Sequence, residues 1–302
     1  MIGAGLLDIE ALKTYITAID EKSFTKASAL LNLSQPTVSA HIKNLERFFQ
    51  TSLIDRSPKH FEVTATGEMV YRRARQVLGL LEKAKNEVKQ FHEQVGGHIH
   101  IGASYTVGEY IIPSILKAFD DMYPAVELQV RIANSKRINR EVQQHELDLG
   151  LVEGKVTEQG LSSVPFVEDE MVVIVPRNHP LRTCEEVSFQ DLQDHTWITR
   201  EGGSGTRAML DYMLESSNIR PKKTITIGSN HGVVQGVKEG LGLSFISKTV
   251  VEHTDAVELI MYLPYIHSTT RSFSIVTPSN EEEITEDAQL FIQHVMKLYE
   301  LS

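Results

Sequence analysis

The side chains in this sequence with the clearest chemistry follow the turn Asn32-Leu33-Ser34. Polar residues there recur on one face of a predicted helix. A Gln amide can pair with an adenine edge, Ser and Thr hydroxyls bond bases or phosphates, and Lys and Arg bind the phosphate backbone. The pattern therefore predicts a surface that contacts DNA. Its predicted members are Ser34, Gln35, Pro36, Thr37, Ser39, His41, Lys43 and Arg47.

Two short helices must position this surface. Ser34 is predicted to cap the second helix, and Pro36 falls in its first turn, where a missing N–H costs nothing. The pair predicts a helix-turn-helix with Gln35–Phe49 as the recognition helix. An ordinary αα-hairpin with a solvated polar face is the alternative. The apolar faces are Phe24, Ala27, Leu30 and Leu31 in the first helix and Val38, Ile42, Leu45 and Phe49 in the second.

Two further elements are predicted around these helices. Asp8–Ile19 has apolar residues at helical spacing and is expected to pack behind the helix-turn-helix. Leu53–Val63 places turn residues between two short apolar runs, which predicts a β-hairpin wing. A wing can bring basic side chains to phosphates or the minor groove, so Arg56 and Lys59 are assigned to DNA contact. Simple solvation of the two side chains is the alternative.

A long helix is predicted from Thr64 or Thr66, either of which could cap it, to about Val95. It contains no proline, and its apolar residues alternate at spacings of four and three. That period over more than three heptads is typical of a helix that pairs with another helix. Packing on its own chain's core is the alternative. The predicted dimer seam is Val70, Ala74, Val77, Leu81, Ala84, Val88 and Phe91.

After Gly96-Gly97 the pattern changes to alternating strands and helices, which predicts a largely parallel α/β sheet. Roughly 200 residues favour two subdomains rather than one. The predicted strands are 98–103, 127–133, 147–152, 171–176, 195–199, 224–228, 243–247 and 273–278. The predicted helices are 108–123, 136–145, 187–193, 204–217, 230–240 and 284–301.

Four junctions after predicted strands are rich in hydroxyls and glycines. Ligands in open α/β sheets bind at such strand ends, near helix N-termini whose free N–H groups attract anions. Each junction alone could be a plain helix cap, but together they predict an anion site. Its predicted members are Ser104, Tyr105, Thr106, Asn134, Ser135, Gly203, Ser204, Gly205, Thr206, Asn230 and His231. Glu153, after a third strand, could bind an amino group or be a solvated rim residue.

Other chemistries are not supported. The single cysteine, Cys184, excludes an internal disulfide, and His98 with His100 lacks a third metal ligand nearby. The GGSGT segment has no P-loop lysine, and no hydrolase elbow or zinc-protease motif occurs. We therefore expect no enzyme activity, metal or cofactor. We also expect no signal peptide or membrane span, which fits a bacterial-type cytoplasm.

Net charge divides unevenly along the chain. Residues 1–94 carry 13 Lys and Arg against 11 Asp and Glu, whereas residues 95–302 carry 17 against 29. The acidic total of −10 therefore lies in the C-terminal part. Residues 1–94 therefore have a net charge of only +2. This small charge predicts that DNA affinity comes from specific side-chain contacts and from dimerisation more than from a strong positive potential.

The segment SFTKASALLNLSQPTVSAHIKNLE resembles the DNA-binding signature of LysR-type transcriptional regulators. Phe24, Ala27-Ser28, Leu31, Ser34-Gln35, Ser39 and Ile42 to Glu46 stand in the family order, with Ser28 where a second Ala is usual. REGGSGTR at 200–207 resembles the REPGSGTR segment of a subset, some responding to carbon- or sulfur-assimilation metabolites, with Gly202 in place of Pro. The segment 228–247 matches a further family segment, in which His231 is unusual.

The resemblance implies an α/β protein with three parts: a winged helix-turn-helix (1–64), a long linker and dimerisation helix (65–95), and a two-lobed effector domain like periplasmic binding proteins (96–302). Lobe 1 is expected at 96–166 and 268–302, and lobe 2 at 167–267. The implied function is sequence-specific regulation of transcription, switched by a small anionic metabolite. The implied partners are an operator in double-stranded DNA, the chain itself as homodimer or homotetramer, and RNA polymerase. A regulator without a ligand, or an α/β enzyme with an accessory helical domain, are the alternatives.

Overall fold

The computed structural model describes residues 7–55, 61–93, 97–184, 187–254, 260–261 and 270–300. The chain divides into two compact units, one formed by Met1–Glu93 with Gln144–Glu146 and the other by Gln94–Gln143 with Leu147–Ser302. The predicted boundaries at 64/65 and 95/96 stay predictions. No helix in the described ranges is both long and apolar enough to cross a membrane.

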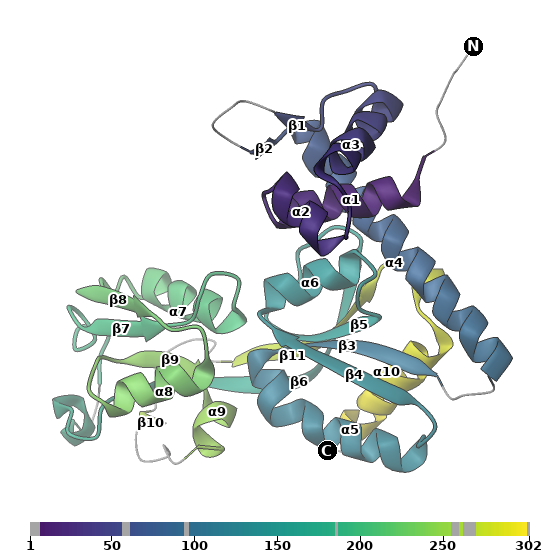
Figure 1. The fold of residues 1–302 in the computed structure, drawn as a ribbon. Helices are drawn as coiled ribbons and strands as arrows, with labels where there is room; N and C mark the ends of the chain where they lie inside the picture. The colour runs from purple at the N-terminus through teal and green to yellow at the C-terminus, as the bar shows by residue number, and fades with distance from the viewer. Residues whose placement is uncertain are drawn as a thin grey trace. The chain divides into compact units, whose positions relative to one another are not determined.

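The first unit contains a helix-turn-helix followed by a short β-hairpin (Figure 1). Ser34 Oγ accepts from Thr37 N at 3.2 Å, and Pro36 lies in the first turn of α3, so both predictions about this helix start are confirmed. Strands β1 and β2 pair antiparallel, as the predicted wing requires. Arg56 and Lys59 lie outside the described residues. The elements are α1 Ile9–Asp20, α2 Phe24–Leu30, α3 Gln35–Phe49, β1 Ile54–Asp55, β2 Glu62–Val63 and α4 Ala65–Glu93.

One apolar core holds the first unit together. It buries most of the predicted apolar faces of α1 and α3, with Tyr15, Ile42 and Leu45 almost fully buried. Leu30 of α2 and Phe49 of α3, which were predicted on the same apolar faces, are instead 62% and 37% exposed, because the core does not extend to the last residue of either helix. Tyr15 also donates from its hydroxyl to Gly67 O at 2.9 Å, which fixes the start of α4 against α1. The helix α4 begins where Thr64 Oγ1 accepts from Gly67 N at 2.9 Å, as expected of a capping Thr.

The long helix α4 uses its predicted seam in two ways. Ala74 is buried in the core of the first unit and Val70 packs against that core, so own-chain packing accounts for these two positions. Further along, Val77 and Val88 are 46% and 58% exposed, and Leu80, which the predicted seam omitted, is 46% exposed. The dimer seam itself stays a prediction.

The second unit is a two-lobed α/β structure in which strand β6 extends from one lobe into the other (Figure 1). The first part of β6 pairs antiparallel with β11, and Met171–Ile174 pair with β9 and β10 instead. The predicted boundary between lobes at 166/167 falls within this strand and stays a prediction. The strands are β3 His98–Ser104, β4 Glu127–Ala133, β5 Leu149–Glu153, β6 Leu161–Ile174, β7 Thr196–Thr199, β8 Lys223–Thr226, β9 Ser244–Ser247, β10 Ile260–Met261 and β11 Thr270–Pro278.

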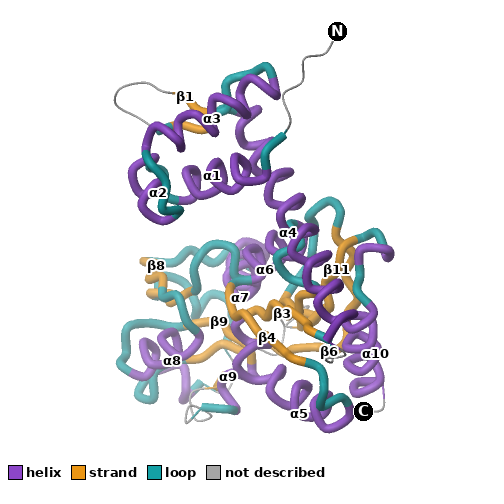
Figure 2. The backbone as a smooth tube through the Cα atoms, turned by 45° about the vertical axis from the view of Figure 1, so that its right-hand side comes forward, coloured by secondary structure: helices purple, strands orange, loops and turns teal. Residues whose placement is uncertain are grey.

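Lobe 1 is built around the strand order β6-β11-β5-β3-β4. Helices α5 and α10 pack together on one face, where Phe119 and Phe291 meet at 5.1 Å between ring centroids, and α6 covers the other (Figure 2). Lobe 2 packs α7, α8 and α9 around β7, β8 and β9, with Trp197 fully buried. The helices are η1 Val107–Ile111, α5 Ile112–Met122, α6 Ser135–Gln143, η2 Pro180–Thr183, α7 Gly205–Ser216, α8 Asn230–Lys238, α9 Lys248–Glu252, η4 Glu281–Glu283 and α10 Glu286–Glu300.

Three expectations about the second unit are wrong. The sheet is mixed rather than largely parallel, because β11 pairs antiparallel with both β5 and β6. Residues 187–193 form successive turns, with i to i+3 backbone bonds such as Leu192 N to Phe189 O, instead of a helix. Strand β6 begins ten residues before the predicted 171, because its first half is an exposed strand whose partner, β11, lies about 100 residues further along.

Candidate functional site

The polar face of α3 carries most of the predicted DNA-contacting side chains at its surface. Ser34, Gln35, Pro36, Lys43 and Arg47 are exposed. Opposite them, the apolar face of α3 is buried in the core, so the helix can present its polar face only outward. Thr37 and Ser39, the remaining members apart from His41, are half-buried.

The amide of Gln35 is held before any DNA is bound. Its Nε2 donates to Thr25 Oγ1 at 2.8 Å, which links the start of the recognition helix to α2. Sequence reasoning did not single out Thr25. A Gln held in this way presents its carbonyl oxygen in a fixed direction at the helix surface.

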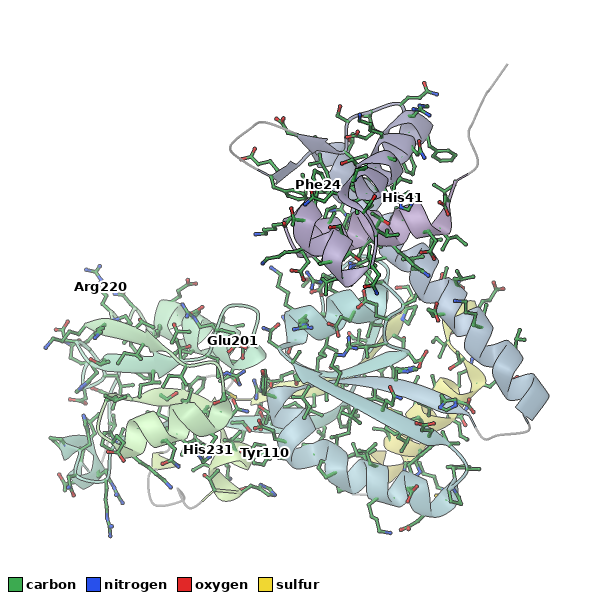
Figure 3. All side chains as sticks on the ribbon, in the orientation of Figure 1. Phe24, His41, Tyr110, Glu201, Arg220 and His231 are labelled. Carbon is green, nitrogen blue, oxygen red and sulfur yellow. The ribbon has the colours of Figure 1, made fainter. Side chains whose placement is uncertain are left out.

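His41, labelled in Figure 3, is likewise bonded to another helix. Its Nδ1 lies 2.8 Å from Thr14 Oγ1 on α1, and Thr14 donates its own hydroxyl proton to Glu10 O. With the Thr14 hydroxyl proton directed to Glu10 O, this bond requires the imidazole tautomer that is protonated at Nδ1. The bond ties α3 to α1, so at least one edge of the His41 ring is used within the protein.

The centre of the second unit is a buried arginine between two carboxylates. Arg271 Nε donates to Asp169 Oδ2 at 2.7 Å, and its Nη1 makes a short ion pair with Glu153 Oε2. All three side chains are at most 2% exposed. Thr206 Oγ1 and Thr106 Oγ1 accept from the same guanidinium at 3.1 and 3.3 Å. Strands β5, β6 and β11 therefore meet with the starts of η1 and α7 at a single charged group.

Glu153 is bonded from both lobes. Thr106 N donates to Oε1 at 3.2 Å, and Thr206 Oγ1 donates to Oε2 at 3.1 Å. Burial by itself would raise the pKa of this carboxyl, but Arg271 and the bonds from Thr106 and Thr206 outweigh it and hold the pKa below its usual value. Glu153 is thus an ionised structural group rather than a solvated rim residue.

Asp169 receives less compensation. Burial raises the pKa of its carboxyl, and Arg271 and the hydroxyl of Ser247, which donates at 2.6 Å, only partly oppose that shift. Ser247 is the last residue of β9, so Asp169 connects β6 to β9 and α9. Neither Asp169 nor Arg271 was predicted from the sequence.

A second arginine lies at the end of β7. Arg200 is buried, donates from Nη1 to Asn230 Oδ1 at 2.6 Å, and is bonded on its Nε and Nη2 edge by Glu201 at 2.9 and 3.1 Å. The Tyr105 ring of lobe 1 lies 4.3 Å from its guanidinium carbon. Asn230 Nδ2 in turn donates to Thr106 Oγ1 at 3.3 Å, so this arginine also connects the lobes.

The predicted site residues are therefore brought together, although several of them bond one another. Tyr105, Thr106, Glu153, Thr206 and Asn230 belong to the interlobe network described above. Other members bond backbone atoms or neighbouring side chains. Ser135 Oγ donates to Glu153 O at 3.1 Å, Gly203 O accepts from Lys136 N at 3.1 Å, and Asn134 Nδ2 donates to Glu201 Oε1 at 3.3 Å.

Two hydroxyls beside this network have no bond. Among the described residues, Ser104 Oγ and Thr199 Oγ1 are buried without a hydrogen-bond partner. They are the last residues of β3 in lobe 1 and of β7 in lobe 2. Ser204, at the start of α7, makes no capping bond within the described residues. Unused donors and acceptors thus gather at the strand ends where a ligand was expected.

Gly205 has a steric reason to be glycine. A Cβ at this position would lie 2.8 Å from Glu153 O, so any side chain would push α7 away from β5. Gly203 has a φ of +94°, in the left-handed region that favours glycine, and its carbonyl faces Lys136 N. Gly203 and Gly205 therefore bring the start of α7 against lobe 1.

An acidic side chain on η1 faces the same region. Burial raises the pKa of Glu109, while Arg200 and His231 oppose that rise. The segment is a π-helical turn, a local geometry that is frequent at functional sites. His231, Tyr110 and Glu201 lie along the side where the two lobes meet (Figure 3). No group of three or more His, Cys, Asp or Glu in the described ranges is arranged to hold a metal ion.

Comparisons with known proteins match both the helix-turn-helix part and the two-lobed part of the chain. The family profile described as the LysR substrate binding domain matches residues 92–299, and that of the bacterial regulatory helix-turn-helix protein, lysR family, matches residues 9–68. The chain is 45% identical over 270 residues to the HTH-type transcriptional regulator CysL of Bacillus subtilis, covering 86% of this chain and 90% of that protein.

Solved structures of similar fold include two regulators. The regulatory domain of CcmR from Synechocystis PCC6803, in complex with 2-PG, superposes with a TM-score of 0.62 at 25% identity, covering 67% of this chain and 97% of that chain. CbnR, a LysR family transcriptional regulator, superposes with a TM-score of 0.70 at 16% identity over 97% of this chain and 99% of that one, which shows the shared fold. With both family profiles matched, the chain belongs to the LysR family of helix-turn-helix transcriptional regulators, with a DNA-binding domain followed by an effector-binding domain.

Proposed function

We propose that a small anionic metabolite, bound between the two lobes of the effector domain, switches this regulator. The observation that carries the proposal is the polar network that joins strand ends of both lobes through Arg200 and Arg271. A ligand held there contacts both lobes at once. It can therefore favour one arrangement of the lobes over another, which is what a switch requires.

The donors at this place suit an anion. The N-terminus of α7 directs its first-turn N–H groups toward the strand ends, and the hydroxyls of Ser104 and Thr199 are unused among the described residues. The CcmR regulatory domain, which is 25% identical, was solved in complex with 2-PG, so a domain of this fold binds a small molecule. Arg271 is fully engaged by Glu153 and Asp169, so the anion is expected to bind the helix start, the hydroxyls and Arg200 instead.

The output of the switch is DNA binding by a homodimer or a dimer of dimers in the cytoplasm, with RNA polymerase as a further partner. The exposed Val77, Leu80 and Val88 of α4 support pairing of that helix with a second copy. Two recognition helices on one operator bind more tightly than one, since the second contact forms at high effective concentration.

A thermal-shift screen of the full-length protein tests the anionic effector. The compounds are sulfate, thiosulfate, phosphoenolpyruvate, O-acetylserine and dicarboxylates, each against chloride at matched ionic strength. A ligand of the folded state stabilises it by ~2.7 kcal/mol at a hundred times its Kd, so the effector raises Tm along a saturable curve. Operator binding is then measured with and without it. A flat response to every compound, with DNA binding intact, contradicts the anionic effector and leaves the regulator assignment in place.

A further inference from the structure

The ion pair of Arg200 and Glu201 is asymmetric in its exposure. The Arg200 side chain is 1% exposed, whereas that of Glu201 is 30% exposed. Glu201 nevertheless takes the whole outer edge of the guanidinium, with Oε2 at 2.9 Å from Nε and Oε1 at 3.1 Å from Nη2. This is the paired geometry in which arginine binds carboxylate and phosphate groups.

The other contacts of Arg200 hold it in place. Asn230 Oδ1 accepts from Nη1 at 2.6 Å, and the Tyr105 ring lies against the guanidinium at 4.3 Å. The arginine is therefore fixed by lobe 2 on one edge and by a lobe 1 ring on its face. Among the described residues, the edge taken by Glu201 is the one hydrogen-bonded by a group that reaches solvent.

A buried guanidinium without a counter-charge is strongly unfavourable, which explains why a carboxylate is present on this edge. Glu201 is the partner that an anion can replace, because its side chain is 30% exposed and already partly hydrated. Glu153 on Arg271 is the contrasting case, since both side chains are 2% exposed and Glu153 is also bonded by Thr106 and Thr206. One arginine thus has a fixed partner and the other a replaceable one.

We propose that the Glu201 carboxylate occupies the place of the effector's anionic group, and that the effector binds Arg200 by displacing it. This inference rests on the proposed function and names the chemistry of the ligand. The group that binds is an oxyanion with two oxygens that can bridge Nε and Nη2, namely a carboxylate, sulfate or phosphate group. The exchange replaces one negative charge by another, so Arg200 always has a counter-ion.

Displacement also changes a contact between the lobes. Asn134 Nδ2, at the start of α6 in lobe 1, donates to Glu201 Oε1 at 3.3 Å. When the ligand takes the Arg200 edge, that bond is lost or passes to the ligand. Glu201 therefore competes with the effector for Arg200. Its displacement also changes the bond that Asn134 of lobe 1 makes to lobe 2. The apparent affinity for the effector is then its intrinsic affinity multiplied by the fraction of molecules in which the Arg200 edge is free of Glu201.

Isothermal titration calorimetry of the full-length protein with sulfate, phosphate and malonate, at constant ionic strength, tests the exchange. The variants are E201Q, E201D, which keeps the charge on a shorter side chain, and D211N. Asp211 pairs with Arg207 on α7 at 2.7 Å and is the matched carboxylate-to-amide control. We expect E201Q to bind at least one of the three anions about ten-fold more tightly than the wild type, because the competing charge is removed. E201D should fall between, and D211N should equal the wild type.

The three anions separate a carboxylate site from a sulfate or phosphate site. Anion binding that is equal in the wild type, E201Q and E201D overturns the exchange and leaves the anionic effector standing. Tighter binding that survives Arg200→Lys in the E201Q background also overturns it, since the anion then binds elsewhere. Absence of binding in the wild type and in folded E201Q and E201D, with circular dichroism confirming the fold, overturns the anionic effector together with the exchange.

Discussion

At the scale of single residues, a few polar side chains carry several bonds each while their neighbours carry none. Thr206 donates to Glu153 and accepts from Arg271, whereas Ser104 Oγ has no partner among the described residues. The same contrast occurs at the DNA-binding face, where Gln35 is held by Thr25. Bonded side chains fix the geometry of a site, and unbonded ones are available to a ligand.

Replacing Gln35 by Ala should weaken operator binding and relax base preference at one position, by ~1–3 kcal/mol for a paired contact to a base. Thr25→Val should blur the preference at the same position, because the Gln35 amide is no longer held. Binding to DNA selected from a randomised pool measures both. Lys43→Ala is the control, since a phosphate contact weakens all sequences alike. Unchanged discrimination in Gln35→Ala would refute the recognition role.

Ser104→Ala should leave the free energy of unfolding within about 0.5 kcal/mol of the wild type, since no bond is lost. Thr206→Val should lower it by ~1–3 kcal/mol, because Glu153 loses a donor and Arg271 an acceptor in a buried site. Urea denaturation measures both values. If Ser104 contacts the effector, its variant loses the ligand-induced rise in Tm yet keeps DNA binding. A full ligand response in Ser104→Ala would remove this residue from the site.

At the scale of elements, the effector domain depends on strands that meet through charges. Strand β6 supplies Asp169, β11 supplies Arg271, and β5 ends at Glu153. These strands belong to lobe 1, but β6 continues into lobe 2, and Asp169 is bonded by Ser247 at the end of β9. The ion cluster therefore lies where the two lobes are joined, and breaking it should affect both.

Glu153→Gln should change how stability depends on pH. The folded pKa of Glu153 lies below its ordinary value of 4.5, so its ionisation stabilises the fold fully above that value. This contribution is lost as the pH falls through the lower folded pKa. The variant should be less stable than the wild type at pH 7. Its free energy of unfolding should also fall less as the pH is lowered, because position 153 no longer titrates. Urea midpoints between pH 7 and 3 measure it, with surface Glu239→Gln as control. Parallel curves for wild type and Glu153→Gln would contradict the assignment.

At the scale of the whole molecule, the chain joins a DNA-binding unit to a ligand-binding unit through α4. The outer half of that helix has apolar side chains that its own chain leaves exposed, among the described residues Val77, Leu80 and Val88. An exposed apolar stripe on a long helix favours association with a second helix. Under the proposed switch, the effector shifts how two paired copies hold their recognition helices.

Leu80→Asp together with Val88→Asp should convert the proposed homodimer into a monomer, because two buried charges would face each other across the seam. Sedimentation velocity measures the mass, and operator binding should weaken by orders of magnitude as the second contact is lost. Leu30→Asp, at a 62% exposed position on α2, is the control for an added surface charge. An unchanged sedimentation coefficient in the double variant would place any dimer contact elsewhere.

Much of this protein was determined by local sequence. Helical spacing and short capping residues predict α1, α3 and the start of α4, because each depends on contacts within a few residues. The polar face of α3, with Gln35 and Ser34, follows from the same spacing. Strand ends with hydroxyls and glycines indicated the polar network between the lobes, including Thr106, Glu153, Thr206 and Asn230, since parallel strands end at one edge.

The tertiary structure decided which of those residues are bonded to what. Arg271 lies 102 residues from Asp169 and 118 from Glu153 along the chain, so no local pattern could pair them. The first half of β6 is exposed and is a strand only because β11 pairs with it. Residues 187–193, in contrast, were predicted as a helix between two strands but form turns. Strand pairing and charge compensation over such separations depend on the folded chain as a whole. The tertiary structure, rather than the local sequence, therefore determines which side chains form the buried ion cluster.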